Sequence, residues 1–146
     1  MDKVLVVGAL GVVGRAAMER FAARPGLRAV GLARRRPDFA PDATWVSADL
    51  RDARATREAL APHRDATHLV YAALNEQPDL LQGWRASENI ELNNRMLRHT
   101  LDALEGAPLR HVTLLQGTKA YGVHTGRPMR VPAREQDAVR DHANFY

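Results

Sequence analysis

Short apolar runs and segments with helical periodicity alternate along this chain. The apolar runs, which predict buried strands, lie at residues 4–7, 27–33, 44–48, 67–72 and 111–115. In the segment 84–105 a helical stripe is formed by Ile90, Leu92, Met96, Leu97, Leu101 and Leu104. Two shorter helices are predicted, one at 15–21 and one that Asp52 caps and Pro62 stops. This alternation predicts an α/β fold.

Repeated strand-helix-strand units place parallel strands in one sheet with helices on both faces, which is the doubly wound (Rossmann) class. Right-handed crossovers give the strand order 3-2-1-4-5. We expect residues 1–146 to form one such domain, with a sheet that is incomplete at its C-terminal end. Sheets of this class bind ligands outside the carboxyl ends of their strands, at the switch point between strands one and four. The loops that follow the strands are therefore the candidate site.

The composition is that of a globular protein, because 45% of the 146 residues are hydrophobic and 26% are charged. The apolar stretch near the N-terminus is too short for a signal peptide, and no run reaches the ~20 residues of a membrane span. We therefore expect a cytoplasmic protein that does not bind membranes. Cysteine is absent, which excludes disulfides, thiolate metal sites and thiol catalysis. Any redox chemistry must come from a cofactor.

The net charge of +4 comes from 21 Lys and Arg residues. The arginines are scattered, without interleaved aromatic residues, so we expect no nucleic acid partner. The six histidines show no metal-ligand spacing, and we expect no metal site. Ser47 and Ser87 are the serines of the chain, and neither lies in a Gly-x-Ser-x-Gly elbow, which argues against a hydrolase.

A glycine cluster follows the first predicted strand and precedes the first helix. Gly8, Gly11 and Gly14 are spaced G-x-x-G-x-x-G, one residue wider than the common dinucleotide motif. Such a turn needs glycine where φ is positive and where the backbone approaches a phosphate. The helix start, with Val12 and Val13, presents free N–H groups to a pyrophosphate. The cluster predicts dinucleotide binding, and the alternative is a plain tight turn.

The end of the second strand indicates which dinucleotide binds. An NAD site places an acidic residue there to hold the ribose hydroxyls, but this chain has Ala33, Arg34 and Arg35. A guanidinium matches a 2′-phosphate and cannot accept a hydrogen bond from a hydroxyl. Arg34 and Arg35 therefore predict NADP(H), the alternative being a basic surface turn.

Three further loops are expected at the same edge of the sheet. They contribute Asp49 and Leu50 after the third strand, Ala72 and Ala73 after the fourth, and Gln116 after the fifth. Candidate residues in the loops after all five strands are less expected by chance than a single glycine motif, and so they are stronger evidence for a binding site. We therefore predict that all five bind the cofactor.

The features that carry a family resemblance are the glycine spacing, Asp49-Leu50 after the third strand, and Asn93 in the long predicted helix. With them the chain resembles the extended short-chain dehydrogenase/reductase superfamily, which includes the epimerases and dehydratases. Within it, the chain is most similar to the progesterone 5β-reductase and iridoid synthase-like enone reductases. The stretches that carry this resemblance are residues 31–35, 67–71, 115–121 and 144–146. The last two stretches are the specific ones, since the glycines and Asp49 would fit any extended member.

The resemblance also implies catalytic residues. No tyrosine forms the superfamily's usual Tyr-x-x-x-Lys pair, because Tyr71 and Tyr121 are followed four residues later by Asn75 and Thr125, and Tyr146 ends the chain. The enone reductases instead take a lysine after strand five and a tyrosine from an Asn-Phe-Tyr-Tyr motif. These correspond to Lys119 and Tyr146, which could donate hydrogen bonds to a substrate carbonyl. The alternatives are a solvated loop lysine and a tail residue.

The sequence thus predicts the N-terminal, cofactor-binding part of an NADPH-dependent reductase whose full-length form reduces a small enone or related carbonyl. Complete members of this class run to ~250 residues or more, so we expect this chain alone to be inactive, with a homodimer possible for the full-length form. The alternatives are an epimerase or dehydratase acting on a sugar nucleotide and a non-catalytic NADP-binding module.

Overall fold

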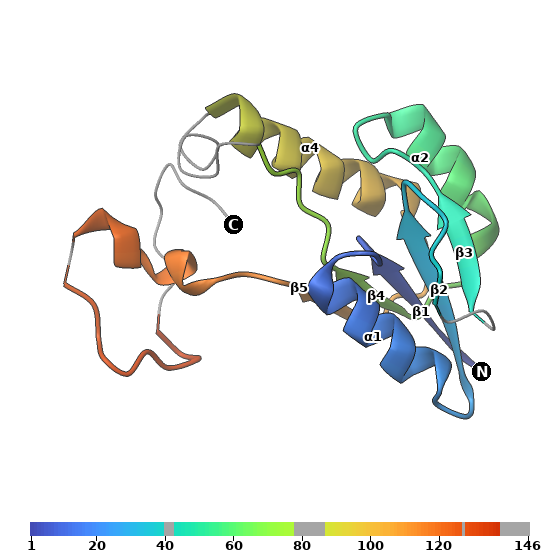
Figure 1. The fold of residues 1–146 in the computed structure, drawn as a ribbon, viewed down its shortest axis with the longest axis horizontal. Helices are drawn as coiled ribbons and strands as arrows, with labels where there is room; N and C mark the ends of the chain where they lie inside the picture. Colours follow the sequence, from blue (N-terminus) through green and yellow to red (C-terminus); the bar gives the residue numbers. More distant parts are fainter. Residues whose placement is uncertain (40–42, 78–86, 127, 138–146) are drawn as a thin grey trace. The chain divides into compact units, whose positions relative to one another are not determined.

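The computed structural model describes residues 1–39, 43–77, 87–126 and 128–137 (Figure 1). These residues form two compact units. The first contains residues 1–75 and 92–114, and the second contains residues 76–91 and 115–146. Each unit is described by itself.

The first unit is built on a parallel sheet of five strands in the order β3-β2-β1-β4-β5 (Figure 1). The strands are β1 (Asp2–Val7), β2 (Leu27–Ala33), β3 (Thr44–Ser47), β4 (His68–Tyr71) and β5 (His111–Leu114). At the centre of the sheet, Val6 of β1 lies opposite Gly31 on one side and Val70 on the other. The predicted class and strand order are confirmed.

Helices cover both faces of this sheet. Successive side chains of a strand point to opposite faces, so the apolar residues of a buried strand need a covering layer on each side. The helices are α1 (Val12–Ala22), α2 (Ala53–Leu60) and α4 (Ser87–Ala103). Val4 and Val6 belong to a core cluster with Met18 of α1. Leu5 and Val7 belong to the opposite cluster, which includes Leu60 of α2 and Met96 of α4. Helix α1 therefore packs on one face, and α2 and α4 pack on the other.

The buried face of α4 differs in part from the predicted stripe. Met96 and Leu104 are buried as expected, but Leu101 is 40% exposed. Thr100 is fully buried instead, and its hydroxyl donates to the Met96 carbonyl at 3.0 Å. A threonine can occupy this core position because its polar atom is satisfied within the helix. The prediction that Leu101 belongs to the core was therefore wrong.

The predicted cap of α2 is confirmed. The Asp52 carboxylate accepts hydrogen bonds from the backbone N–H groups of Arg54 and Ala55 at 2.9 and 3.0 Å. The helix ends at Leu60 and continues as the short 3₁₀ segment η1 (Ala61–His63), which contains Pro62. This capping fixes where the chain turns after β3.

In the second unit, two short 3₁₀ segments follow the sheet along the chain. They are η2 (Thr118–Tyr121) and η3 (Val123–Thr125), separated by Gly122 in a left-handed conformation. Across the described residues of both units, no helix has the length and apolar character that a membrane span requires.

Candidate functional site

The turn between β1 and α1 is held tightly at its start. The backbone N–H groups of Gly8 and Ala9 both donate to the Leu32 carbonyl of β2, at 3.0 and 3.1 Å. The Gly11 N–H then returns to the Gly8 carbonyl at 3.0 Å, and the first helical bond of α1 follows. The turn is thus a fixed part of the sheet edge.

Two of the three glycines are required by the packing of the protein itself. Gly8 has a φ of +82°, and a Cβ there would lie 2.5 Å from the Ala73 nitrogen. At Gly14 a Cβ would overlap the Gly8 carbonyl oxygen. Both positions exclude any side chain because neighbouring backbone already fills the space. The expected positive φ therefore occurs at Gly8.

Gly11 is different. Its backbone is extended, with φ −70° and ψ 166°, a conformation open to any residue. A Cβ there would meet only the Gly8 carbonyl oxygen, at the ordinary contact distance of 3.4 Å, and the residue is exposed. Nothing in the described structure therefore requires glycine at this position. The shape suits a ligand that approaches the backbone from outside.

The N-terminus of α1 is open to such a ligand. No side chain caps it, and no acidic residue lies in its first turn. The N–H groups of Val12, Val13 and Gly14 have no acceptor within the helix. The valines are 91% and 52% exposed, respectively. With the helix dipole, these N–H groups favour an anion.

The loop after β4 meets this turn at the carboxyl edge of the sheet. Gly8 packs against Ala72 and Ala73, and the Ala72 N–H donates to the Val7 carbonyl at 2.8 Å. On the other side, the loop after β2 is tied to β3, since the Ser47 hydroxyl donates to the Arg34 carbonyl at 3.2 Å. These contacts join the loop after β1 to that after β4, and the loop after β2 to the end of β3. That all five loops bind the cofactor stays a prediction.

Asn93 of α4 supports the loop after β4. Its side-chain oxygen accepts from the Asn75 N–H at 2.7 Å, and its amide donates to the Asn75 carbonyl at 3.1 Å. These two bonds fix the loop that contacts the glycine turn. The asparagine singled out in the sequence therefore has a structural role in shaping this edge.

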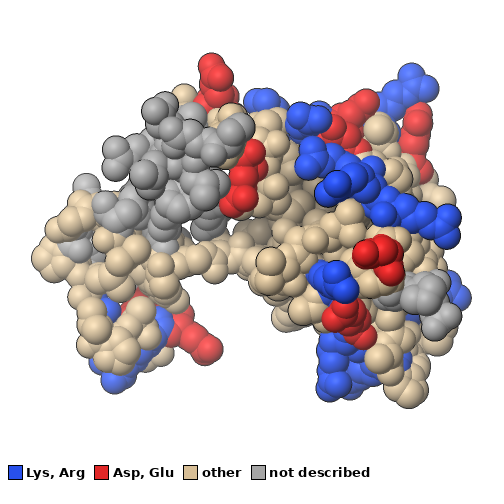
Figure 2. Space-filling model, viewed as in Figure 1, with Lys and Arg blue, Asp and Glu red and all other residues tan. Residues whose placement is uncertain are grey.

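Arg34 and Arg35 are exposed at the end of β2. Figure 2 shows Lys and Arg side chains gathered across the region of α2 and β3, which lies beside the end of β2. Arg34 and Arg35 therefore contribute positive charge at the end of β2.

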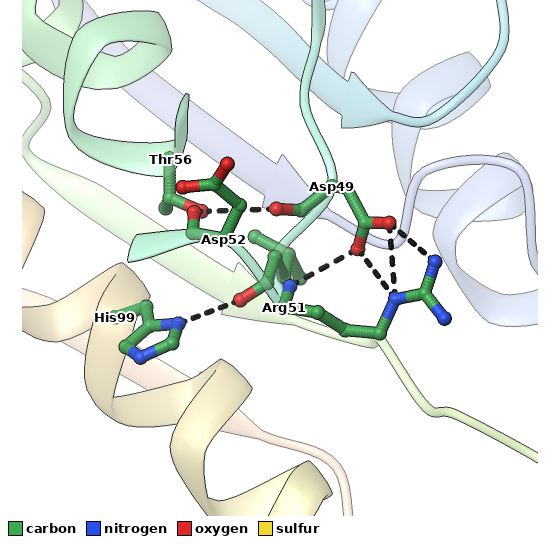
Figure 3. A network of polar contacts seen from close by, with 6 residues as sticks. Asp49, Arg51, Asp52, Thr56 and His99 are labelled. Atoms are coloured by element: carbon green, nitrogen blue, oxygen red, sulfur yellow. Dashed lines mark hydrogen bonds and ion pairs between the residues drawn. The ribbon is translucent and has the colours of Figure 1, made fainter. Parts of the chain in front are cut away.

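Asp49 and Leu50 follow β3 in a network of polar contacts (Figure 3). The Asp49 carboxylate is paired with Arg51, and the hydrogen bond from that side chain lowers the pKa of Asp49. Leu50 packs its side chain into the core, and its carbonyl accepts a hydrogen bond from Nδ1 of His99 at 2.8 Å. Leu50 can therefore offer a ligand its backbone only. Sequence reasoning overlooked Arg51, for which the signal was the Asp-x-Arg spacing.

The described part of the first unit contains neither of the predicted catalytic residues, Lys119 and Tyr146, nor Gln116, which is predicted to bind the cofactor. Gln116 follows β5 and Lys119 lies in η2, both in the second unit. Tyr146 lies outside the described residues. Tyr71 is buried in the core, where burial raises its pKa, so its hydroxyl is not placed for chemistry at the sheet edge. The roles of Gln116, Lys119 and Tyr146 stay predictions.

Comparison with known proteins places the chain in a family. Residues 4–145 match the model of the NAD dependent epimerase/dehydratase family. A 3-oxo-Delta(4,5)-steroid 5-beta-reductase of Arabidopsis thaliana is 37% identical over 97% of the chain, and an (S)-8-oxocitronellyl enol synthase of Camptotheca acuminata is 34% identical over 80%. The chain spans only 38% and 31% of the lengths of these relatives.

A solved structure supports the fold. A short-chain dehydrogenase/reductase superfamily protein of Agrobacterium tumefaciens, determined with bound NAD, superimposes with a TM-score of 0.71 at 20% identity. The match covers 97% of this chain and 40% of that protein. Together with the parallel sheet and the glycine turn, these matches show that the chain belongs to the NAD dependent epimerase/dehydratase family.

Proposed function

We propose that this chain binds NADP(H) at the turn between β1 and α1. The pyrophosphate would lie against the N–H groups of Val12, Val13 and Gly14. The observation that carries the proposal is Gly11, where a side chain would fit the protein but would occupy the space in front of an uncapped helix N-terminus. A ligand that needs that space accounts for the glycine, whereas a plain tight turn does not.

The preference for NADP(H) over NAD(H) rests on the end of β2. Arg34 and Arg35 are exposed there, at the position where an NAD site has an acidic residue. Guanidinium groups donate hydrogen bonds to a phosphate, but they cannot accept one from a ribose hydroxyl. The 2′-phosphate of NADP(H) therefore meets two arginines at the mouth of the site.

Replacement of Arg34 and Arg35 by alanine tests the preference. We expect the unchanged chain to bind NADPH more tightly than NADH in calorimetric titrations. The double variant should lose NADPH affinity by roughly 10- to 100-fold, since a hydrogen bond to a charged group contributes about 1.5–3 kcal/mol. Its affinity for NADH should change little, because NADH has no 2′-phosphate.

A double variant at two exposed arginines, Arg20→Ala in α1 with Arg24→Ala in the turn that follows it, removes the same charge and is the matched control. It should keep the preference. Equal affinities of the unchanged chain for the two dinucleotides would contradict the assignment and leave Arg34 and Arg35 as a basic surface turn.

We propose that the chain is the N-terminal part of a longer protein that reduces an enone or related carbonyl. Two of its relatives are named as a steroid 5-beta-reductase and an enol synthase. A bound nicotinamide supplies the hydride. The ammonium of Lys119 and the phenol of Tyr146 would donate hydrogen bonds to the substrate carbonyl, which stabilises the enolate formed as hydride adds to the β-carbon. A cytoplasmic location and a homodimer are part of the same proposal.

Under this proposal the reading frame continues beyond Tyr146, and the residues encoded there distinguish this activity from an epimerase or dehydratase. A tyrosine followed by acidic residues supports the enone reductase. A lysine four positions after Tyr146 would complete the pair Tyr-x-x-x-Lys and support an epimerase-type enzyme instead. A protein that binds NADPH at full length but turns over neither substrate class would be a non-catalytic module.

A further inference from the structure

A buried charge lies at the amino edge of the sheet, at the opposite end of the strands from the glycine turn. Lys3, near the start of β1, is only 5% exposed. Its ammonium is paired with the carboxylate of Asp65, which lies between η1 and β4 and whose side chain is 64% exposed. A lysine is rarely this buried unless it is paired. The pair therefore fixes a positive charge at the start of the sheet.

The turn that carries Asp65 is held against β1 by hydrogen bonds. The Thr67 N–H donates to the Lys3 carbonyl at 2.9 Å, and the Lys3 N–H donates to the Thr67 hydroxyl at 3.0 Å. The turn itself is closed by the Ala66 N–H, which donates to the His63 carbonyl at 3.0 Å. These bonds keep residues 63–67 next to the start of β1.

The imidazole of His63 is enclosed at one of its two nitrogens. The side chain is partly buried, and Nδ1 is inaccessible to solvent and has no hydrogen-bond partner among the described residues. In the protonated ring both nitrogens carry a hydrogen, so Nδ1 would be a charged donor without an acceptor. Burying such a donor is costly. The surroundings of His63 therefore favour the neutral ring.

The charges near His63 come from three parts of the first unit. Burial lowers the pKa of His63, and the cations of Lys3 in β1 and Arg28 in β2 lower it further. Asp65 has the opposite effect, but its carboxylate is already paired with Lys3. Arg64, which follows His63, donates to the Glu105 carbonyl. A proton on His63 would thus add a third positive charge where one exposed carboxylate is present.

We infer that His63, with the neighbouring cations of Lys3 and Arg28, is an acid-sensitive element of the fold, whose protonation weakens the packing of residues 63–67 against β1. Above about pH 6.5, the ordinary pKa of histidine, the ring is neutral in the folded and the unfolded chain. Below that pH the unfolded chain takes up a proton that the folded chain resists, so the free energy of unfolding falls as the pH is lowered.

The Lys3–Asp65 pair responds to acid in a different pH range. The hydrogen bond from Lys3 lowers the pKa of Asp65. The stability that this carboxylate contributes is therefore present above its ordinary pKa of about 3.9 and is lost only below it. Measurements between pH 5 and 7.5 isolate the effect of His63 from that of Asp65.

The test is urea unfolding, followed by circular dichroism between pH 5 and 7.5, of the unchanged chain, His63→Gln and His111→Gln. His111 is an exposed histidine of β5 and is the matched control. The slope of the unfolding free energy against pH gives the number of protons taken up on unfolding. We expect His63→Gln to reduce this uptake by up to one proton, and His111→Gln to leave it unchanged. Equal uptake in His63→Gln and the unchanged chain would overturn the inference.

NMR titration of the His63 ring is a second test, and it does not depend on the stability of His63→Gln. In the folded, unchanged chain the midpoint should lie at a lower pH than that of a histidine model peptide in the same buffer. Lys3→Met removes one cation and should move this midpoint to a higher pH. A midpoint equal to that of the peptide, or one that Lys3→Met leaves unmoved, would contradict the role of the cluster. Neither result bears on the dinucleotide site, which is at the other edge of the sheet.

Discussion

Valine in place of Gly11 should abolish dinucleotide binding while the protein stays folded. A Cβ at this position meets only the Gly8 carbonyl oxygen, at 3.4 Å, and the backbone is in a conformation that valine adopts readily. The branched side chain would stand in front of the N–H groups where the pyrophosphate is expected to lie. We expect affinity for NADPH to fall by roughly a hundredfold or more, which corresponds to about 2.7 kcal/mol, in a calorimetric titration.

Two comparison variants make this result specific. Ala16→Val adds the same branched side chain at an exposed position of α1 and should keep NADPH affinity. Gly14→Val should destabilise the protein by more than the ~1 kcal/mol of a typical substitution, because its Cβ would overlap the Gly8 carbonyl oxygen. Unchanged NADPH affinity in a folded Gly11→Val protein would show that the turn has a structural role alone.

The second large effect concerns turnover. NADPH oxidation with a panel of small enones should be undetectable for residues 1–146 and measurable for a protein continued through the reading frame downstream of Tyr146. The chain spans 38% of the length of the related 5-beta-reductase, and the remaining part would enclose the substrate. Without that enclosure the positioning that supplies roughly 7–11 kcal/mol of the barrier is lost.

The roles assigned to Lys119 and Tyr146 are tested in the longer protein. Lys119→Met should lower kcat by orders of magnitude with little effect on NADPH affinity, since the ammonium is proposed to act on the substrate carbonyl. Arg130→Gln, at an exposed position of the same unit, is the control and should keep the rate. Comparable rates for the 146-residue chain and the longer protein would refute the view that the chain lacks part of its active site.

The sheet and its order were predictable because the strands are apolar runs and crossovers have one hand. The start of α2 was equally predictable, since Asp52 caps it through its own side chain. Leu101 was misplaced because a helical stripe identifies a face only approximately, and the buried position went to Thr100, whose hydroxyl is satisfied by a backbone carbonyl. Polar residues with local partners are not recognisable from hydrophobic periodicity.

At the site, residue types predicted the position of the turn but not the different reasons for its glycines. The sequence spacing does not distinguish Gly8, Gly11 and Gly14 from one another. The structure shows that nearby backbone leaves no room for a side chain at Gly8 and Gly14 but does leave room at Gly11. The pairing of Asp49 with Arg51 also needed coordinates, because either residue alone has several possible partners. Three-dimensional contacts therefore separate the residues that shape the turn from those available to a ligand.

The most direct test of the central claim is a titration of the ¹⁵N-labelled chain with NADPH, followed by NMR of the backbone amides. The largest shifts are predicted for the amides of residues 11–14, with a second group at Arg34 and Arg35 that responds to NADPH more strongly than to NADH. The absence of shifts at saturating NADPH, or shifts that leave residues 11–14 unmoved, would contradict the assignment of this turn as the dinucleotide site.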